Sequence, residues 1–116
     1  MQSELIVFHT TSKDVVCESW LTKHDLVHWK TCIRQIIIGF SDSAKNPGWE
    51  DTYRGAEAYK FLQEIISGLH SRILGETEIL GQFKILSELH HKNNPKFWDC
   101  ILKDAKFIRA NYLKDY

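Results

Sequence analysis

The sequence predicts an α+β fold, in which a small sheet with one helix is followed by a helical bundle. Two short runs rich in β-branched and aromatic residues lie within the first 40 residues, which is typical of strands. After residue 52, apolar side chains recur at helical spacing almost to the end of the chain. Residues 41–51 are dense in turn formers and separate the two patterns. We therefore expect one domain of residues 1–116, with a small α/β part over 1–46 and a helical part over 47–116.

The small α/β part begins and ends with a predicted strand. The first strand is ELIVFHT at residues 4–10 and the second is CIRQIIIGF at residues 32–40, and we expect both in one sheet. Between them a helix is predicted over residues 12–23, because Ser12 is a plausible N-cap. Its apolar residues recur near a helical period: Val15, Val16, Trp20 and Leu21.

The helical part contains three amphipathic segments, which are enough to close a small bundle. The first two carry apolar residues at helical spacing over 58–69 and 79–89. The third is predicted to begin with Asn94 as N-cap and Pro95 as the first helical residue, a position that proline favours. Its apolar residues continue at helical spacing as far as Tyr112.

Composition and charge exclude several classes of protein. A chain of 116 residues that is 43% hydrophobic can form one compact core. Fifteen basic and fifteen acidic residues give no net charge, so no overall field attracts the chain to nucleic acid or to an anionic membrane. No signal-peptide pattern opens the chain, and the longest apolar run, Ile36–Phe40, is too short to span a membrane. We expect a soluble, cytoplasmic protein.

The three cysteines, Cys17, Cys32 and Cys100, are odd in number and widely spaced, which argues against a disulfide framework and against a zinc site. Cys32 stands out because Arg34 follows two residues later, and on an extended strand these two side chains share a face. A guanidinium beside the thiol favours the thiolate that a nucleophile needs. The alternative is a buried cysteine that packs as a small hydrophobic residue, and spacing alone favours this alternative.

The histidines and paired carboxylates give weaker signals. His24 and His28 are four residues apart and would share one face of a helix, a spacing found in metal sites. No cysteine or carboxylate stands at a matching spacing, so we expect surface or interface histidines and no metal. Glu76 and Glu78 are too close in sequence for an acid and base pair, and the first turn of a helix explains both.

Several stretches together resemble the N-terminal domain of glutamyl-tRNA reductase. The segment YRGAEAYKFLQEIISGLHSRILGETEILGQFK, residues 53–84, contains GLHSRILGETEILGQ where the family reads approximately GLDSxxLGEPQILGQ. KTCIRQIII at 30–38 is similar to the family's STCNRTEIY, and FHTTSKDVV at 8–16 is similar to its opening NHKTAPV. AKFIRANYL at 105–113 is similar to AKRVRTET, which in the family leads into a long helix. The resemblance covers most of the chain.

The resemblance implies both a fold and a reaction. The family's N-terminal domain has a small ferredoxin-like sheet followed by a helical bundle, and here the sheet is reduced because the second helix of a ferredoxin-like unit has no evident place. In the family a cysteine attacks the ester of glutamyl-tRNA, and hydride from NADPH reduces the thioester to glutamate-1-semialdehyde for tetrapyrrole (porphyrin and heme) synthesis. NADPH is bound there by a separate domain. This sequence contains no GxGxxG, so we expect no cofactor in this chain and no hydride transfer by it alone.

The resemblance also implies site residues. Cys32 is the counterpart of the nucleophile, and Arg34 is the natural partner for a substrate carboxylate. Gly68, Gly75 and Gly81 would let the backbone approach a ligand. The positions assigned to substrate binding are Thr31, Ile33, Arg34, Ser71, Glu76, Thr77, Glu78 and Gln82.

The sequence departs from the family at positions that bear on activity. Phe61 stands where the family has a histidine important for activity, and a phenyl ring cannot donate a hydrogen bond or carry a proton. Glu78 replaces a glutamine and would repel a glutamate side chain. The other departures are Ile33 for asparagine, Gln35 and Ile36 for a threonine and glutamate pair, and His70 for aspartate.

Two hypotheses follow. The chain is either a thioester-forming catalytic domain, which is cut from a longer chain or works with a separate reductase subunit, or a degenerate binding or regulatory module that keeps the scaffold and pocket. The expected partners are glutamyl-tRNA or a glutamate-like ligand, a protein partner, or a second copy of the chain, and we expect no membrane. Binding of a tetrapyrrole or metal through His70 is a third hypothesis, supported by composition alone.

Overall fold

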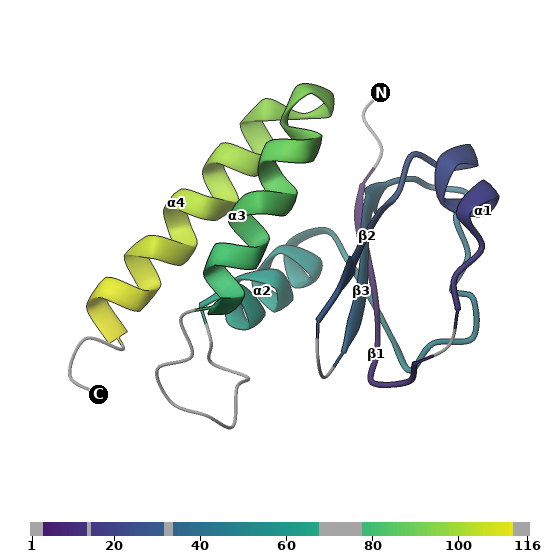
Figure 1. Ribbon diagram of the computed structural model, residues 1–116, viewed down its shortest axis with the longest axis horizontal. Helices are drawn as coiled ribbons and strands as arrows, with labels where there is room; N and C mark the ends of the chain where they lie inside the picture. Colours follow the sequence, from purple (N-terminus) through teal and green to yellow (C-terminus); the bar gives the residue numbers. More distant parts are fainter. Residues whose placement is uncertain (1–3, 14, 32–33, 68–77, 113–116) are drawn as a thin grey trace. The chain divides into compact units, whose positions relative to one another are not determined.

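The computed structural model describes residues 4–13, 15–31, 34–67 and 78–112, without the side chains of 78–80 and 109–112. It has the predicted α+β fold (Figure 1). The elements in chain order are β1 Leu5–Thr10, α1 Glu18–Lys23, β2 Val27–Lys30, β3 Gln35–Phe40, β4 Asp51–Arg54, α2 Gly55–Ile66, α3 Glu78–His90, the 3₁₀ helix η1 His91–Asn93, and α4 Pro95–Tyr112.

The chain divides into two compact units, Met1–Tyr59 and Lys60–Tyr116, and each is described by itself. The division lies within α2, whereas the sequence pattern suggested a change near residues 46 and 47. The difference arises from β4, a strand that the pattern did not predict. Its residues pair with β1 and so extend the first unit beyond the turn-rich segment.

The first unit is built on a four-stranded antiparallel sheet with strand order β2-β3-β1-β4. This is the order of a ferredoxin-like sheet, in which the first and third strands are the central pair. Residues 41–50, which connect β3 to β4, contain bends and no helix, in agreement with the expectation that the second helix of a ferredoxin-like unit has no place here. The two predicted strands are therefore confirmed as the centre of one sheet, and β2 and β4 lie at its edges.

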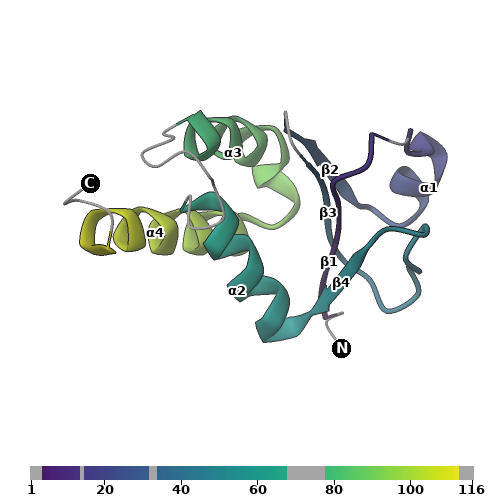
Figure 2. The ribbon, with the colours of Figure 1, turned by 90° about the horizontal axis from the view of Figure 1, so that it is seen from below.

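One face of the sheet packs against α1 and the connecting segments (Figure 2). Phe8 lies at the centre of this core, with its ring centroid 6.1 Å from that of Trp20 on α1. Burial of each large apolar side chain contributes about 1.5–3 kcal/mol. The buried members of the cluster are Ile6, Phe8, Leu26, Ile37, Ala44 and Trp49, with Val16, Trp20 and Leu21 partly buried against them.

The opposite face of the sheet is also buried. Val7, Ile36 and Ile38 are 0–1% exposed, so the alternation of β1 and β3 leaves neither face in water. His9 is on this face too and is only 7% exposed. A buried imidazole requires hydrogen-bond partners, and those partners form the candidate site described below.

Two predicted elements begin later than the sequence suggested. The strand predicted from Cys32 begins at Gln35, because the chain forms a hairpin turn before it. The helix predicted from Ser12 begins at Glu18, with Cys17 as its N-cap residue. The backbone N–H of Ser12 donates to Thr10 Oγ1 at 3.0 Å, a local bond that competes with helix formation, and residues 15–17 are not helical.

The segment between α1 and β3 also differs from the helical interpretation. Asp25 adopts a left-handed conformation with φ of 53°, which ends α1. His24 is therefore the C-cap residue of α1, whereas His28 lies in β2. The two histidines do not share a helical face, and the spacing argument for a metal pair does not apply.

The second unit contains most of α2 together with α3 and α4. Phe83 of α3 packs against Trp98 of α4 with ring centroids 5.5 Å apart, and both are buried. Gln63 Nε2 on α2 donates to the carbonyl oxygen of Ile101 at 3.0 Å, which joins α2 to α4. The predicted start of α4 at Pro95 is confirmed.

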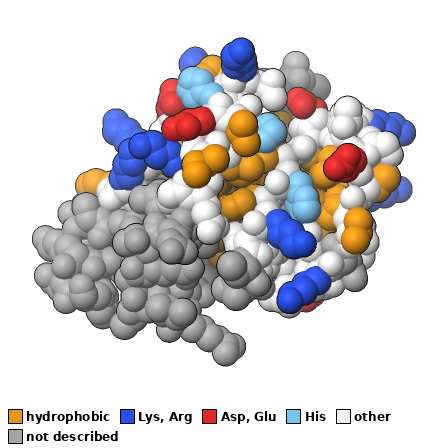
Figure 3. Space-filling model, in the orientation of Figure 1, with side chains coloured by type: hydrophobic (Ala, Val, Ile, Leu, Met, Phe, Trp, Pro, Cys, Tyr) orange, Lys and Arg blue, Asp and Glu red, His pale blue; other side chains and the backbone are white. Residues whose placement is uncertain are grey.

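The surface shows charges of both signs. On the face drawn in Figure 3, basic and acidic side chains are interspersed with histidines and apolar groups. Among the helices of the described residues, none is both long and apolar enough to cross a membrane.

Candidate functional site

The candidate site is built on the hairpin that joins β2 to β3. The strands pair as far as Lys30 and Gln35. Beyond them the backbone N–H of Thr31 donates to the carbonyl oxygen of Arg34 at 2.8 Å. The hydroxyl of Thr31 also donates to that oxygen and accepts from the backbone N–H of Arg34, both at 3.2 Å. Thr31 thus fixes the backbone of Arg34, and the structure brings together two of the predicted site residues.

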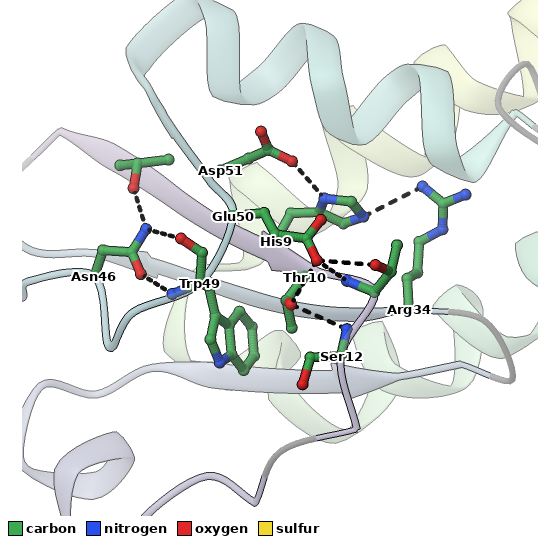
Figure 4. Close-up of polar contacts among 10 residues, drawn as sticks. His9, Thr10, Ser12, Arg34, Asn46, Trp49, Glu50 and Asp51 are labelled. Carbon is green, nitrogen blue, oxygen red and sulfur yellow. Dashed lines mark hydrogen bonds and ion pairs between the residues drawn. The ribbon is translucent and has the colours of Figure 1, made fainter.

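The guanidinium of Arg34 is directed toward β1 (Figure 4). Its NH1 lies 3.5 Å from His9 Nε2, at the long end of the hydrogen-bond range. On the other side of the ring, His9 Nδ1 lies 2.9 Å from Asp51 Oδ2. Asp51 is directly opposite His9 in the register of β1 and β4, so strand pairing places the carboxylate at the ring.

A second carboxylate, that of Glu50, is fixed beside this group. Its Oε1 accepts from the hydroxyl of Thr11 at 2.9 Å, from the backbone N–H of Thr11 at 3.3 Å and from the hydroxyl of Thr10 at 3.3 Å. These bonds favour the charged form, so the pKa of Glu50 is lowered, chiefly by the Thr11 hydroxyl and then by the Thr11 backbone. The candidate site therefore has, at one edge, a carboxylate whose charged form these hydrogen bonds stabilise.

The other predicted site residues that the structure describes belong to the second unit. Gln82 lies in α3 and is exposed, and Glu78 is the first residue of α3. Phe61, which the resemblance places opposite the family's histidine, is buried in α2 at 7% exposure. The predictions for Cys32, Ile33, Gly68, His70, Ser71, Gly75, Glu76 and Thr77 lie outside the described residues.

The opposite face of the same hairpin carries a polar link that accounts for Gln35. This side chain is 3% exposed, and its Nε2 donates to the carbonyl oxygen of Ser12 at 2.8 Å. Its Oε1 must then accept from His28 Nε2, which lies 2.8 Å away. Gln35 is a structural residue that ties β3 to β2 and to the segment before α1.

Cys17 is a further reactive candidate, on the exposed end of α1. Its Sγ lies 3.0 Å from the hydroxyl of Ser19, and its pKa is lowered, chiefly by that hydrogen bond and then by the backbone N–H groups of Trp20 and Ser19. Within the described ranges no three residues among His, Cys, Asp and Glu come close enough to hold a metal ion.

Comparison with known proteins gives the same family as the resemblance in the sequence. A family described as glutamyl-tRNAGlu reductase, N-terminal domain, matches residues 4–102, which include the whole sheet and the hairpin. The chain belongs to the glutamyl-tRNA reductase family. A glutamyl-tRNA reductase from Hydrogenovibrio crunogenus is 37% identical over 65 residues, which are 51% of this chain and 15% of that protein. The match thus spans about one seventh of the relative's length.

The family match confirms the resemblance, but sequence reasoning did not single out His9, Asp51, Glu50 or Cys17 as members of a site. For His9 a signal was present, because it is the one ionisable residue of the predicted strand after Glu4 and lies in the stretch similar to NHKTAPV. For Asp51 none was available, since its place beside His9 depends on β4.

Proposed function

We propose that this chain supplies the ester-binding and thioester-forming part of a glutamyl-tRNA reductase in tetrapyrrole biosynthesis, with Cys32 as the nucleophile. The observation that supports it is the hairpin in which Thr31 fixes Arg34 by three hydrogen bonds on either side of Cys32 in the chain. Packing alone does not require an arginine whose backbone is bonded to Thr31 and whose guanidinium lies beside a buried histidine. Because the chain matches this family, thioester formation with glutamyl-tRNA is the reaction to test first.

The proposed step is an acyl transfer. The thiolate of Cys32 attacks the carbonyl carbon of the ester between glutamate and the terminal ribose of tRNA. A C–S bond forms, the C–O bond of the ester breaks, and the ribose oxygen leaves with a proton. Water then attacks the thioester carbon, so that glutamate is released and the thiol is restored.

Arg34 has a specific task in this step. The α-carboxyl of the substrate is esterified, so its only free carboxylate is the one on the side chain. A guanidinium is suited to this group because its planar donors bind both oxygens. Thr31, Ile33, Ser71, Glu76, Thr77, Glu78 and Gln82 are proposed as further substrate contacts.

Hydride transfer is not assigned to this chain. A dinucleotide needs a glycine-rich turn between a strand and a helix N-terminus. Here β4 runs directly into α2 through Gly55. A Cβ at Gly55 would lie 2.5 Å from Glu4 Oε1. The carboxylate of Glu4 therefore occupies the space beside this junction that a pyrophosphate would have to enter. These residues do not fit NADPH, and we propose that a separate reductase domain supplies it.

The second candidate function is a binding or regulatory module that keeps the scaffold without turnover. Phe61 favours it, because a buried phenyl ring stands at the position of the family's active-site histidine. Such a module would hold a glutamate-like ligand or a protein partner, and self-association belongs to the same proposal. In either case we place the protein in the cytoplasm, where its three cysteine thiols would stay reduced.

The test is deacylation of charged glutamyl-tRNA by the purified chain, followed as release of free glutamate. The enzyme proposal predicts release above the spontaneous rate, and Cys32→Ser returns the rate to the spontaneous one. Equal rates for the wild-type protein and Cys32→Ser would refute the nucleophile and favour the binding module.

A further inference from the structure

The group formed by Asp51, His9 and Arg34 has a defined direction of hydrogen bonding. A carboxylate only accepts and a guanidinium only donates. His9 contacts a carboxylate oxygen at Nδ1 and a guanidinium nitrogen at Nε2, so the ring satisfies both neighbours only when Nδ1 carries the proton and Nε2 is the acceptor. The structure therefore assigns the neutral Nδ1–H tautomer to His9.

The buried position of the His9 ring restricts its orientation. His9 is on the central strand β1, between β3 and β4, and its side chain is 9% exposed, whereas that of Asp51 is 41% exposed. A buried ring on a strand cannot turn away to water, so its orientation is set by Asp51. The ring in turn offers Arg34 one acceptor at a fixed place.

We propose that Asp51 and His9 are positioning residues for Arg34, which they hold in the orientation that selects a substrate with a free side-chain carboxylate. This inference rests on the proposed function, because it takes Arg34 as the group that binds that carboxylate. Neither His9 nor Asp51 touches the substrate in this scheme. The pair acts through the guanidinium, so its loss weakens selectivity for the charged ligand.

The test separates binding from chemistry by using Cys32→Ser, which cannot form the thioester. The probes are glutamate α-methyl ester and glutamine α-methyl ester, which differ in the charge of the side chain. We expect the Cys32→Ser protein to prefer the glutamate ester in NMR titrations. We expect that adding His9→Phe or Asp51→Leu lowers that preference about tenfold. This factor corresponds to the loss of one hydrogen bond to a charged group.

Matched variants distinguish positioning from stability. His9→Gln keeps an acceptor near Arg34 and restores part of the preference that His9→Phe removes. Asp99→Asn changes a comparable carboxylate, which pairs with His91 in the second unit, and leaves the preference unchanged. Asp51→Leu alters a partly exposed edge residue, so it gives a folded variant even where His9→Phe does not.

Two results would overturn the inference. One is a preference for the glutamate ester that survives both His9→Phe and Asp51→Leu, or that is absent from Cys32→Ser itself. The other is a ¹⁵N spectrum that places the proton of His9 on Nε2. Neither result depends on turnover, so failure of the thioester chemistry is seen separately, as equal deacylation by the wild-type protein and Cys32→Ser.

Discussion

At the scale of single residues, the hydrogen bonds to Glu50 determine how its carboxyl titrates. Because the folded protein lowers the pKa of this group, its contribution to stability is present above the pKa of the unfolded chain and is lost as the pH falls through the pKa of the folded one. We predict that NMR titration gives Glu50 a pKa below its ordinary value and that Thr11→Val raises it. An unchanged pKa in Thr11→Val would contradict the assigned cause.

Cys17 gives a second prediction at this scale. Its lowered pKa places more of the thiol in the thiolate form at neutral pH, and the thiolate is the form that reacts with iodoacetamide. We expect Ser19→Ala to slow alkylation of Cys17 severalfold, because the hydroxyl of Ser19 is the main cause of the shift. Cys100 is also exposed and far from Ser19 in the chain, so its rate is the internal control. Equal rates at Cys17 in both proteins would refute this explanation.

At the scale of elements, Gly81 tests two interpretations of the glycines. The sequence suggested that Gly81 brings the backbone close to a ligand, yet the residue lies inside α3, and a Cβ there meets no described atom within 4 Å. Glycine within a helix costs roughly 0.5–1 kcal/mol relative to alanine. We therefore expect Gly81→Ala to raise the free energy of unfolding by about that amount, measured by urea denaturation. A loss of stability, or loss of ester binding, would favour the close-approach interpretation.

The same scale shows which elements are predictable from sequence. β1 and β3 contain the apolar runs Leu5–Phe8 and Ile36–Ile38 because both of their faces are buried, and both strands were identified. β2 and β4 are four residues each and take their pairing from the central strands, so local pattern does not reveal them. Because β2 was not predicted, the hairpin that joins it to β3 was assigned to the second strand. The predicted strand therefore began too early.

At the scale of the whole molecule, the α+β fold and the family follow from patterns that extend over many residues. Cys32 and Arg34 were expected to share one face of an extended strand. The structure instead places Arg34 in a hairpin, where its backbone is bonded to Thr31. The link from Arg34 through His9 to Asp51 was not predictable. It joins residues 25 and 42 positions apart, and it depends on strand pairing that no local signal encodes.

The most direct test of thioester formation is to locate the glutamyl group on the protein. We propose to incubate charged glutamyl-tRNA with a Cys17→Ser, Cys100→Ser protein, in which Cys32 is the remaining thiol. The sample is quenched in acid, digested and mapped by mass spectrometry. Thioester chemistry predicts one glutamyl group on the peptide that contains Cys32, and release of that group by hydroxylamine. Deacylation without an adduct on that peptide, or an adduct that persists in Cys32→Ser, would contradict it.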